Sequence, residues 1–131
     1  MKKYLCPNCL TPLNVNNDIV LRAKNDIGQK GLVFLHSELG NYSSKFSADF
    51  TVVIGDHVKF SCPVCHHNLT NTKNERLASF ICIDEANQES TIVFSQIYGE
   101  QCTYRVEQNE VRESFGDHFG LYNNPDWFMF F

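Results

Sequence analysis

The sequence predicts a mostly β protein with little helix. Several short segments alternate apolar and polar residues or are rich in β-branched and aromatic side chains, which is typical of strands. Glycine, asparagine and aspartate separate these segments at short intervals, as they do in turns. No stretch before Ser114 shows helical periodicity over a dozen residues. A chain of 131 residues with these features is expected to form one compact antiparallel β domain.

The first half of the chain predicts short strands separated by loops. Residues 19–24 alternate, with Ile19, Leu21 and Ala23 on one face. Residues 32–35 form a short apolar strand, and the polar, glycine-containing residues 25–31 and 37–47 are expected to be loops. Gly55-Asp56 between two apolar runs is a hairpin signal, with strands expected over residues 50–54 and 57–60.

The second half predicts an antiparallel meander. Turn-forming residues at 85–90 and 99–101 separate alternating or β-branched segments. Its strands are expected at residues 79–84, 91–98, 102–107 and 110–115. Residues 74–77 could make one helical turn. The expected domain therefore covers residues 1–113, with the meander over about 78–113, and is followed by a distinct segment, 114–131.

Residues 114–131 contain seven aromatic side chains among glycine, asparagine and proline. Because burying one aromatic side chain is worth ~1.5–3 kcal/mol, this segment is expected to pack on its own sheet, on a second copy of the chain, or on another protein. A protein partner is expected to contact its end, at Trp127, Phe128, Phe130 and Phe131.

Composition and charge narrow the class of protein. No apolar run approaches the ~20 residues that cross a bilayer, and a cysteine motif stands where the apolar core of a signal peptide would be. We therefore expect a cytoplasmic protein.

The charge of the chain is unevenly distributed. The net charge is −4, with nine Lys and Arg against six Asp and Glu in residues 1–76 and two against nine in residues 77–131. The average charge thus lacks the basic footprint of a nucleic-acid-binding protein, although a local patch stays open as an alternative. Its members would be Lys2, Lys3, Arg22, Lys24 and Lys30.

Two pairs of the form Cys-Pro-x-Cys carry the clearest chemistry: Cys6 with Cys9, and Cys62 with Cys65. A Cys-x-x-Cys turn aims two sulfurs at one point, and two such turns complete the four-thiolate tetrahedron that Zn²⁺ prefers. The 52 residues between the pairs are no obstacle, because the entropy of loop closure grows only logarithmically with length. The sequence therefore predicts a structural zinc site at Cys6, Cys9, Cys62 and Cys65.

Other interpretations of the cysteines stay open. Iron accepts the same four thiolates, although Leu10 and His66 stand where iron knuckles of the rubredoxin kind have glycine. Thiol redox chemistry is disfavoured because too few residues precede Cys6 to build a strand–turn–helix redox unit. A catalytic zinc would need an open ligand position, so His66 and His67 are expected to be polar loop residues beside the knuckle.

Cys82 and Cys102 lack a paired motif and are expected to be small buried apolar residues. No glycine-rich phosphate loop, nucleophile elbow or His-Glu-x-x-His helix is present, so no catalytic residues are predicted.

With its four cysteines placed, the chain resembles a zinc ribbon, in which two knuckles are clamped between β-hairpins. The stretch Gly55-Asp56-His57-Val58-Lys59-Phe60-Ser61-Cys62-Pro63-Val64-Cys65 is similar to the strand that enters a ribbon knuckle, and the whole chain is similar to small uncharacterised bacterial zinc-ribbon proteins. The resemblance implies Zn²⁺ on the four cysteines. Zinc ribbons serve RNA polymerase, ribosomes, chaperones and enzymes alike, so the resemblance does not choose a partner.

The sequence favours a non-enzymatic zinc-ribbon protein that acts as an interaction module, with a protein as its partner. The alternative is an RNA-, ribosome- or transcription-associated ribbon, in which the basic residues of the first half bind phosphates and Tyr4 and Tyr42 stack on bases. The third hypothesis is a thiol redox or metal-handling protein.

Overall fold

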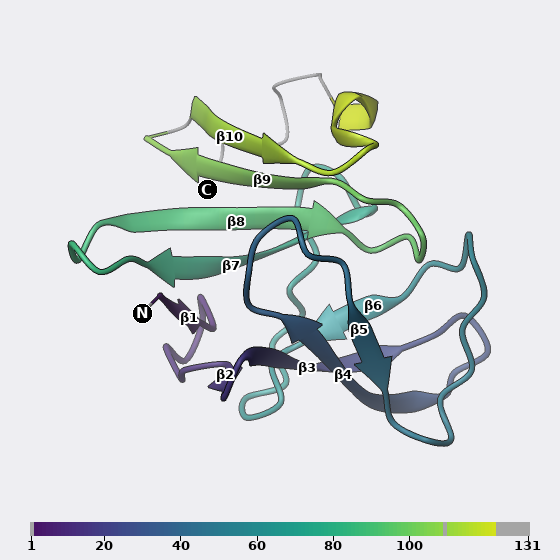
Figure 1. Cartoon of the computed structure of the whole chain (residues 1–131). Coiled ribbons are helices and arrows are strands. Elements are labelled where there is room, and N and C mark those ends of the chain that lie inside the picture. Colours follow the sequence, from purple (N-terminus) through teal and green to yellow (C-terminus); the bar gives the residue numbers. More distant parts are fainter. Residues whose placement is uncertain (1, 109, 123–131) are drawn as a thin grey trace.

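The computed structural model describes residues 2–108 and 110–122 and contains two antiparallel sheets (Figure 1). The first sheet is built from β1 (Lys3–Leu5), β7 (Leu77–Ile83), β8 (Glu89–Ser95), β9 (Thr103–Glu107) and β10 (Glu110–Phe115), in that order. The second has the order β2 (Asn14–Val15), β3 (Asp18–Lys24), β4 (Lys30–His36) and β5 (Ser44–Phe46), and β6 (Lys59–Ser61) also pairs with β3. The prediction of a mostly β fold is confirmed.

Strands β7 to β10 form the meander that the sequence predicts. Each pairs antiparallel with the next, and Phe80 lies opposite Ile92 while Val93 lies opposite Tyr104. Because successive side chains of a strand point to opposite faces, this register gives the first sheet two apolar faces. One face packs against the second sheet, and the other belongs to a separate cluster of buried residues.

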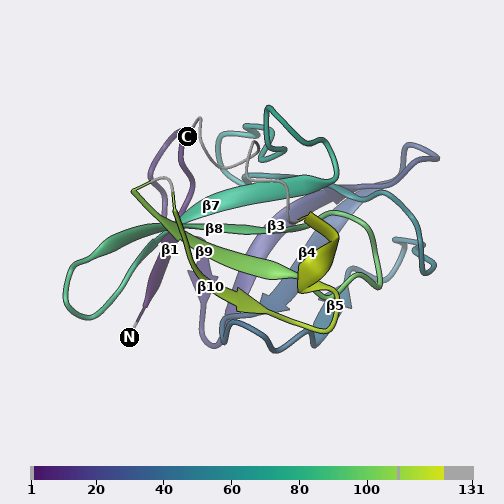
Figure 2. The same cartoon turned by 90° about the horizontal axis from the view of Figure 1, so that it is seen from above.

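The main core lies between the two sheets. Leu21, Val33 and Phe60 of the second sheet belong to the same buried cluster as Phe80 and Ile92 of the first. Aromatic rings link the layers, since the centroid of Phe60 is 5.5 Å from that of Phe94, which lies 5.4 Å from Phe80. Seen from above, β7 to β9 lie over β3 and β4 (Figure 2).

The far face of the first sheet carries a second, smaller cluster. It contains Val93, Tyr104 and Val106 of β8 and β9, together with Tyr122. Tyr122 ends η1 (Phe119–Tyr122), a short 3₁₀ turn and the one helical segment among the described residues. A membrane-spanning helix is not found within residues 2–108 and 110–122.

The hairpin predicted around Gly55-Asp56 does not form. Residues 50–58 make no strand, and their turn instead bonds to the connection that follows β8: Gly55 N–H donates to Tyr98 O at 2.8 Å, and Tyr98 N–H to Asp56 O at 2.8 Å. These long-range hydrogen bonds form in place of a local hairpin, and the side chain of Ile54 is 82% exposed.

A further local expectation is wrong. Residues 37–47, expected to be a loop, contain the edge strand β5, whose Ser44 and Lys45 are exposed and carry no apolar alternation. Residues 74–77 form a single hydrogen-bonded turn, in which the N–H of Leu77 donates to the carbonyl of Asn74 at 3.1 Å, and no helix follows it. The side-chain Oδ1 of Asn71 accepts hydrogen bonds from the N–H groups of Lys73 and Asn74, and the chain then enters β7 at Leu77.

Candidate metal centre

The sheet register brings the two cysteine pairs together. β2 and β6 pair with different parts of the same strand, β3: Asn14 lies opposite Ile19, and Ser61 lies opposite Arg22. The first cysteine pair precedes β2 and the second follows β6. Because β2 and β6 lie along β3, the two pairs meet although 52 residues separate them in the sequence.

Each cysteine pair lies in a turn that connects the two sheets. The first turn leads from β1 in the first sheet to β2 in the second and is closed by a bridge between Leu5 and Pro12. The second follows β6 and is closed by a bridge between Ser61 and Asn68, after which Thr70 pairs with Ala78 of β7. A metal ion at the cysteines would therefore tie both inter-sheet connections to one point.

The two turns have the same backbone geometry. In the first, the carbonyl of Cys6 accepts the N–H of Leu10 at 2.9 Å, and in the second the carbonyl of Cys62 accepts the N–H of His66 at 3.0 Å. The N–H of Asn8 points to Cys6 Sγ at 3.4 Å, and that of Val64 points to Cys62 Sγ at 3.3 Å. Such N–H···S contacts stabilise thiolates, so both turns are prepared to present sulfur ligands.

Leu10 and His66 have φ angles of 62° and 64°, in the left-handed region that favours glycine. A left-handed conformation costs an ordinary residue ~1–2 kcal/mol, which the surrounding structure must offset. His66 thus serves the turn through its backbone. The same is true of His67, whose carbonyl accepts the N–H of Cys62 at 3.0 Å.

The four predicted sulfurs form one cluster. The Sγ atoms of Cys6, Cys9, Cys62 and Cys65 all lie within 4.8 Å of one another. Two of the edges, Cys6–Cys65 and Cys9–Cys62, measure 3.7 and 3.8 Å. A tetrahedron with metal–sulfur bonds of ~2.3 Å has edges of about 3.8 Å, so the arrangement has the size of a four-thiolate metal site. None of the four cysteines is in a disulfide.

The electrostatic environment differs between the inner and outer sulfurs. Burial raises the pKa of Cys6 to about 12 in the metal-free site. Contacts with the side chain and backbone of Thr11 lower the pKa of Cys9 to about 6, and hydrogen bonds from Asn8 and from the backbone of His67 lower that of Cys65. A divalent cation would offset the cost of a buried thiolate, because metal binding releases the proton from each ligand thiol.

The residues present fit a soft divalent metal. Four thiolates suit zinc or iron, and they would fill all four positions of a tetrahedral ion. The structure supports metal binding by these cysteines.

The two remaining cysteines take no part in the cluster. Cys82 and Cys102 are each 1% exposed, and they belong to the clusters on opposite faces of the first sheet. Burial raises the pKa of both thiols, that of Cys102 to about 12. Both are therefore buried neutral thiols, as the sequence predicts.

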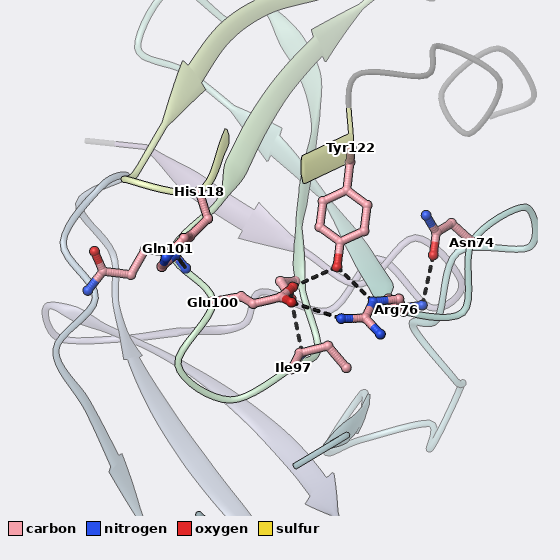
Figure 3. A network of polar contacts seen from close by, with 8 residues as sticks. Asn74, Arg76, Ile97, Glu100, Gln101, His118 and Tyr122 are labelled. Carbon is pink, nitrogen blue, oxygen red and sulfur yellow. Dashed lines mark hydrogen bonds and ion pairs between the residues drawn. The ribbon is translucent and has the colours of Figure 1, made fainter. Parts of the chain in front are cut away.

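A network of polar side chains joins the residue before β7, the connection between β8 and β9, and η1 (Figure 3). Glu100 accepts hydrogen bonds from the hydroxyls of Tyr122 at 2.6 Å and Ser95 at 2.7 Å, and it forms a 2.8 Å ion pair with Arg76. Burial raises the pKa of Glu100, but these three partners outweigh it, so the net shift is downward. A carboxylate held by three donors is well suited to fix η1 against the sheet and poorly suited to accept a proton.

A cavity of about 370 Å³ lies between the sheets beside this network. Its walls are largely aromatic and aliphatic and include Leu35, Phe46, Phe80, Phe94 and Tyr98. Two of the polar groups that line it are bonded within the protein: Glu100 has the partners given above, and the hydroxyl of Tyr42 lies 2.9 Å from that of Thr103.

The structure also locates the aromatic residues expected to stack on bases. Tyr4 is 1% exposed and its hydroxyl donates to Ser37 O at 2.6 Å, so the expectation of a surface ring is wrong. Tyr42 is half-buried, with its hydroxyl turned to Thr103. Trp127, Phe128, Phe130 and Phe131 lie outside the described residues, and their contact with a partner stays a prediction.

Comparisons with protein-family models, with curated proteins and with solved structures found no match to this chain.

Proposed function

We propose that this chain is a non-enzymatic zinc-ribbon protein that acts as a macromolecular interaction module. The observation that carries the proposal is the sulfur cluster, whose 3.7 and 3.8 Å edges match a four-thiolate zinc site. Four protein ligands leave no position for a substrate or a water molecule, which favours a structural ion over a catalytic one.

The position of the cluster supports a structural role. Both turns that connect the sheets place their cysteines in this cluster. The strands that lead into these turns, β1 and β6, are short, with three residues each. Such strands gain little from pairing alone, so a metal ion that fixes both turns would supply much of their stability. Reduced thiols of this kind persist in the cytoplasm, which is the compartment we propose.

Metal analysis of the purified chain tests the site. We expect one zinc per chain, and we expect Cys62→Ser to lose the zinc. Cys82→Ser is the matched control, because Cys82 is also a buried free thiol but lies outside the cluster. A fully folded, metal-free protein, or equal zinc content in both variants, would contradict the proposal. If one iron per chain is found instead, recognised by its strong visible absorption, the metal in the proposal is wrong but the four-cysteine site is right.

The same sample separates the redox hypothesis from the structural one. Thiol titration of the native zinc protein should report no rapidly reacting cysteine, because the four clustered thiolates are ligands and Cys82 and Cys102 are buried. Reversible formation of a disulfide between Cys6 and Cys9 under mild oxidation, without loss of a metal, would favour redox chemistry instead.

A further inference from the structure

The outer face of the second sheet gathers cations that are far apart in the sequence. Lys24 of β3 lies directly opposite Lys30 of β4 on one side and opposite Lys59 of β6 on the other. Residues directly opposite in an antiparallel pair share a face, so these three lysines form a row across β4, β3 and β6. Arg22, two residues before Lys24, and Lys45, opposite Phe34, lie on the same face.

We call this surface the basic face and define it by its eight residues. It carries five of the eleven Lys and Arg residues of a chain whose net charge is −4. Its members are Val20, Arg22, Lys24, Lys30, Leu32, Phe34, Lys45 and Lys59.

Among residues 2–108 and 110–122, no ion pair is found for the five cations of the basic face. The ion pairs between described side chains belong to Arg76, Arg105 and Arg112, all outside this face. Along β3 the nearest acidic residues are Asp18, at the opposite end of the strand, and Asp26, in the turn that follows it. Lys24, Lys30 and Lys59 are exposed. Like charges placed directly opposite each other destabilise a sheet, so the row costs stability in the free protein.

Apolar side chains adjoin the cations. Val20, Leu32 and Phe34 lie on the basic face, because their strand neighbours Leu21 and Val33 point into the core. Leu32 is 38% exposed, and Phe34 and Val20 are partly exposed. Lys45 lies opposite Phe34, and Lys30 lies four residues along the same strand. An aromatic ring on a sheet with cations on the same face is the arrangement that binds a base by stacking and the neighbouring phosphates by charge.

We infer that the basic face binds single-stranded nucleic acid, with phosphates on the lysine row and a base on Phe34. This inference rests on the proposed function only in that the chain acts by binding a macromolecule. The basic face is built from strands β3 to β6 and has no helix to place in a duplex groove, which favours a single strand over a duplex. An acidic partner without aromatic rings would contact the lysines but would offer nothing for Phe34 to stack on.

The test uses the zinc-loaded full chain and a fluorescently labelled twelve-residue oligouridylate, measured by polarisation between 50 and 200 mM salt. Five phosphate contacts would give a slope of log K against log salt of about −3.5, which is the upper limit for this face. Lys24→Gln, Lys30→Gln and Lys59→Gln together should remove most of the binding at 50 mM salt and flatten the slope by about 2. Phe34→Ala should weaken binding by roughly 5- to 150-fold and leave the slope unchanged.

A triple variant with the same change in charge is the control. Lys2→Gln, Lys3→Gln and Lys73→Gln remove three cations outside the basic face and should change the affinity less than about threefold. Zinc content and thermal unfolding show that each variant is folded, and Lys24→Gln should raise the midpoint of unfolding because it relieves the like-charge row.

Three results would overturn the inference: no binding at 50 mM salt by the zinc-loaded chain, equal losses in the face and control variants, or equal affinity for duplex RNA, polyglutamate or anionic vesicles. Each of these leaves the zinc measurement untouched, so failure here is distinct from failure of the proposed metal site.

Discussion

Gln96 is the residue whose replacement tests most directly how the two sheets are joined. It lies just after β8 and is 1% exposed. Its Oε1 accepts the N–H of Phe60 in β6 at 3.0 Å, and its Nε2 donates to the carbonyl of Glu75 at 2.9 Å and to the hydroxyl of Thr70 at 3.1 Å. The side chain therefore pairs a backbone group of the second sheet with one beside the first.

Gln96→Leu keeps the volume and removes these bonds. The N–H of Phe60 and the carbonyl of Glu75 would then lose their side-chain partner, and a buried backbone group without a partner costs about 1–3 kcal/mol. Two such groups predict a loss of roughly 2–6 kcal/mol, a large part of the ~5–15 kcal/mol that stabilises a domain.

Guanidinium denaturation of the zinc-loaded protein, followed by circular dichroism, measures this loss as a lower midpoint at unchanged slope. Gln88→Leu is the matched control, because Gln88 is exposed in the turn between β7 and β8 and its side chain makes no hydrogen bond. The reasoning is refuted if Gln96→Leu stays within ~0.5 kcal/mol of the native protein, the range of ordinary surface substitutions. Thr70→Val should also cost less in the Gln96→Leu background than alone, because the two side chains share a bond.

Three further substitutions test local features of the structure. Glu100→Gln should cost about 1–3 kcal/mol at neutral pH. The pKa of Glu100 is lowered in the folded state. The stability that its carboxylate contributes is therefore complete above the ordinary carboxyl pKa and is lost as the pH falls through the lowered value. Urea titrations should show the stabilities of the two proteins converging in acid. Leu10→Gly should raise stability by ~0.5–1 kcal/mol and Leu10→Val should lower it, since only glycine adopts a φ of 62° without strain. Thermal melts of the zinc-loaded variants measure both changes. Gly116→Ala should lower stability by at least ~2 kcal/mol in the same melts, because its φ is 93° and a Cβ would lie 2.1 Å from the carbonyl oxygen of Gln101; an unchanged midpoint would contradict this.

The sequence predicts the meander and the cysteine cluster because both leave local signals. Leu77–Ile83 is apolar at every position but Ser79, which is typical of a buried strand, and a Cys-x-x-Cys turn needs only four residues to place two sulfurs. Strand β5 and the turn at Gly55 leave weaker signals. β5 is an edge strand with one apolar residue, Phe46, and the Gly55 turn bonds to Tyr98, which the sequence does not place beside it.

The local basic patch that the sequence leaves open contains three cations of the basic face, Arg22, Lys24 and Lys30. It also includes Lys3, which lies in β1 of the first sheet, and it misses Lys45 and Lys59, because the full set depends on register. Lys24, Lys30 and Lys59 come from three strands, and an average over residues 1–76 dilutes them among six acidic residues. A shift of one residue in either pairing would turn one lysine to the core face and break the row. The net charge of the chain favours a protein partner, whereas the row of lysines set by the strand register favours a polyanion.

The cysteine cluster and the basic face are mechanically connected. Lys59 lies in β6, which has three residues and is followed directly by Cys62. So short a strand holds its register with β3 through few bonds of its own, and its position depends on what fixes its ends. Gln96 fixes it at the N–H of Phe60, and a metal on Cys62 would fix the residue that follows it. The cysteine cluster would then do more than stabilise the fold, because it would keep Lys59 in line with Lys24 and so determine the spacing of charges that a phosphate chain meets.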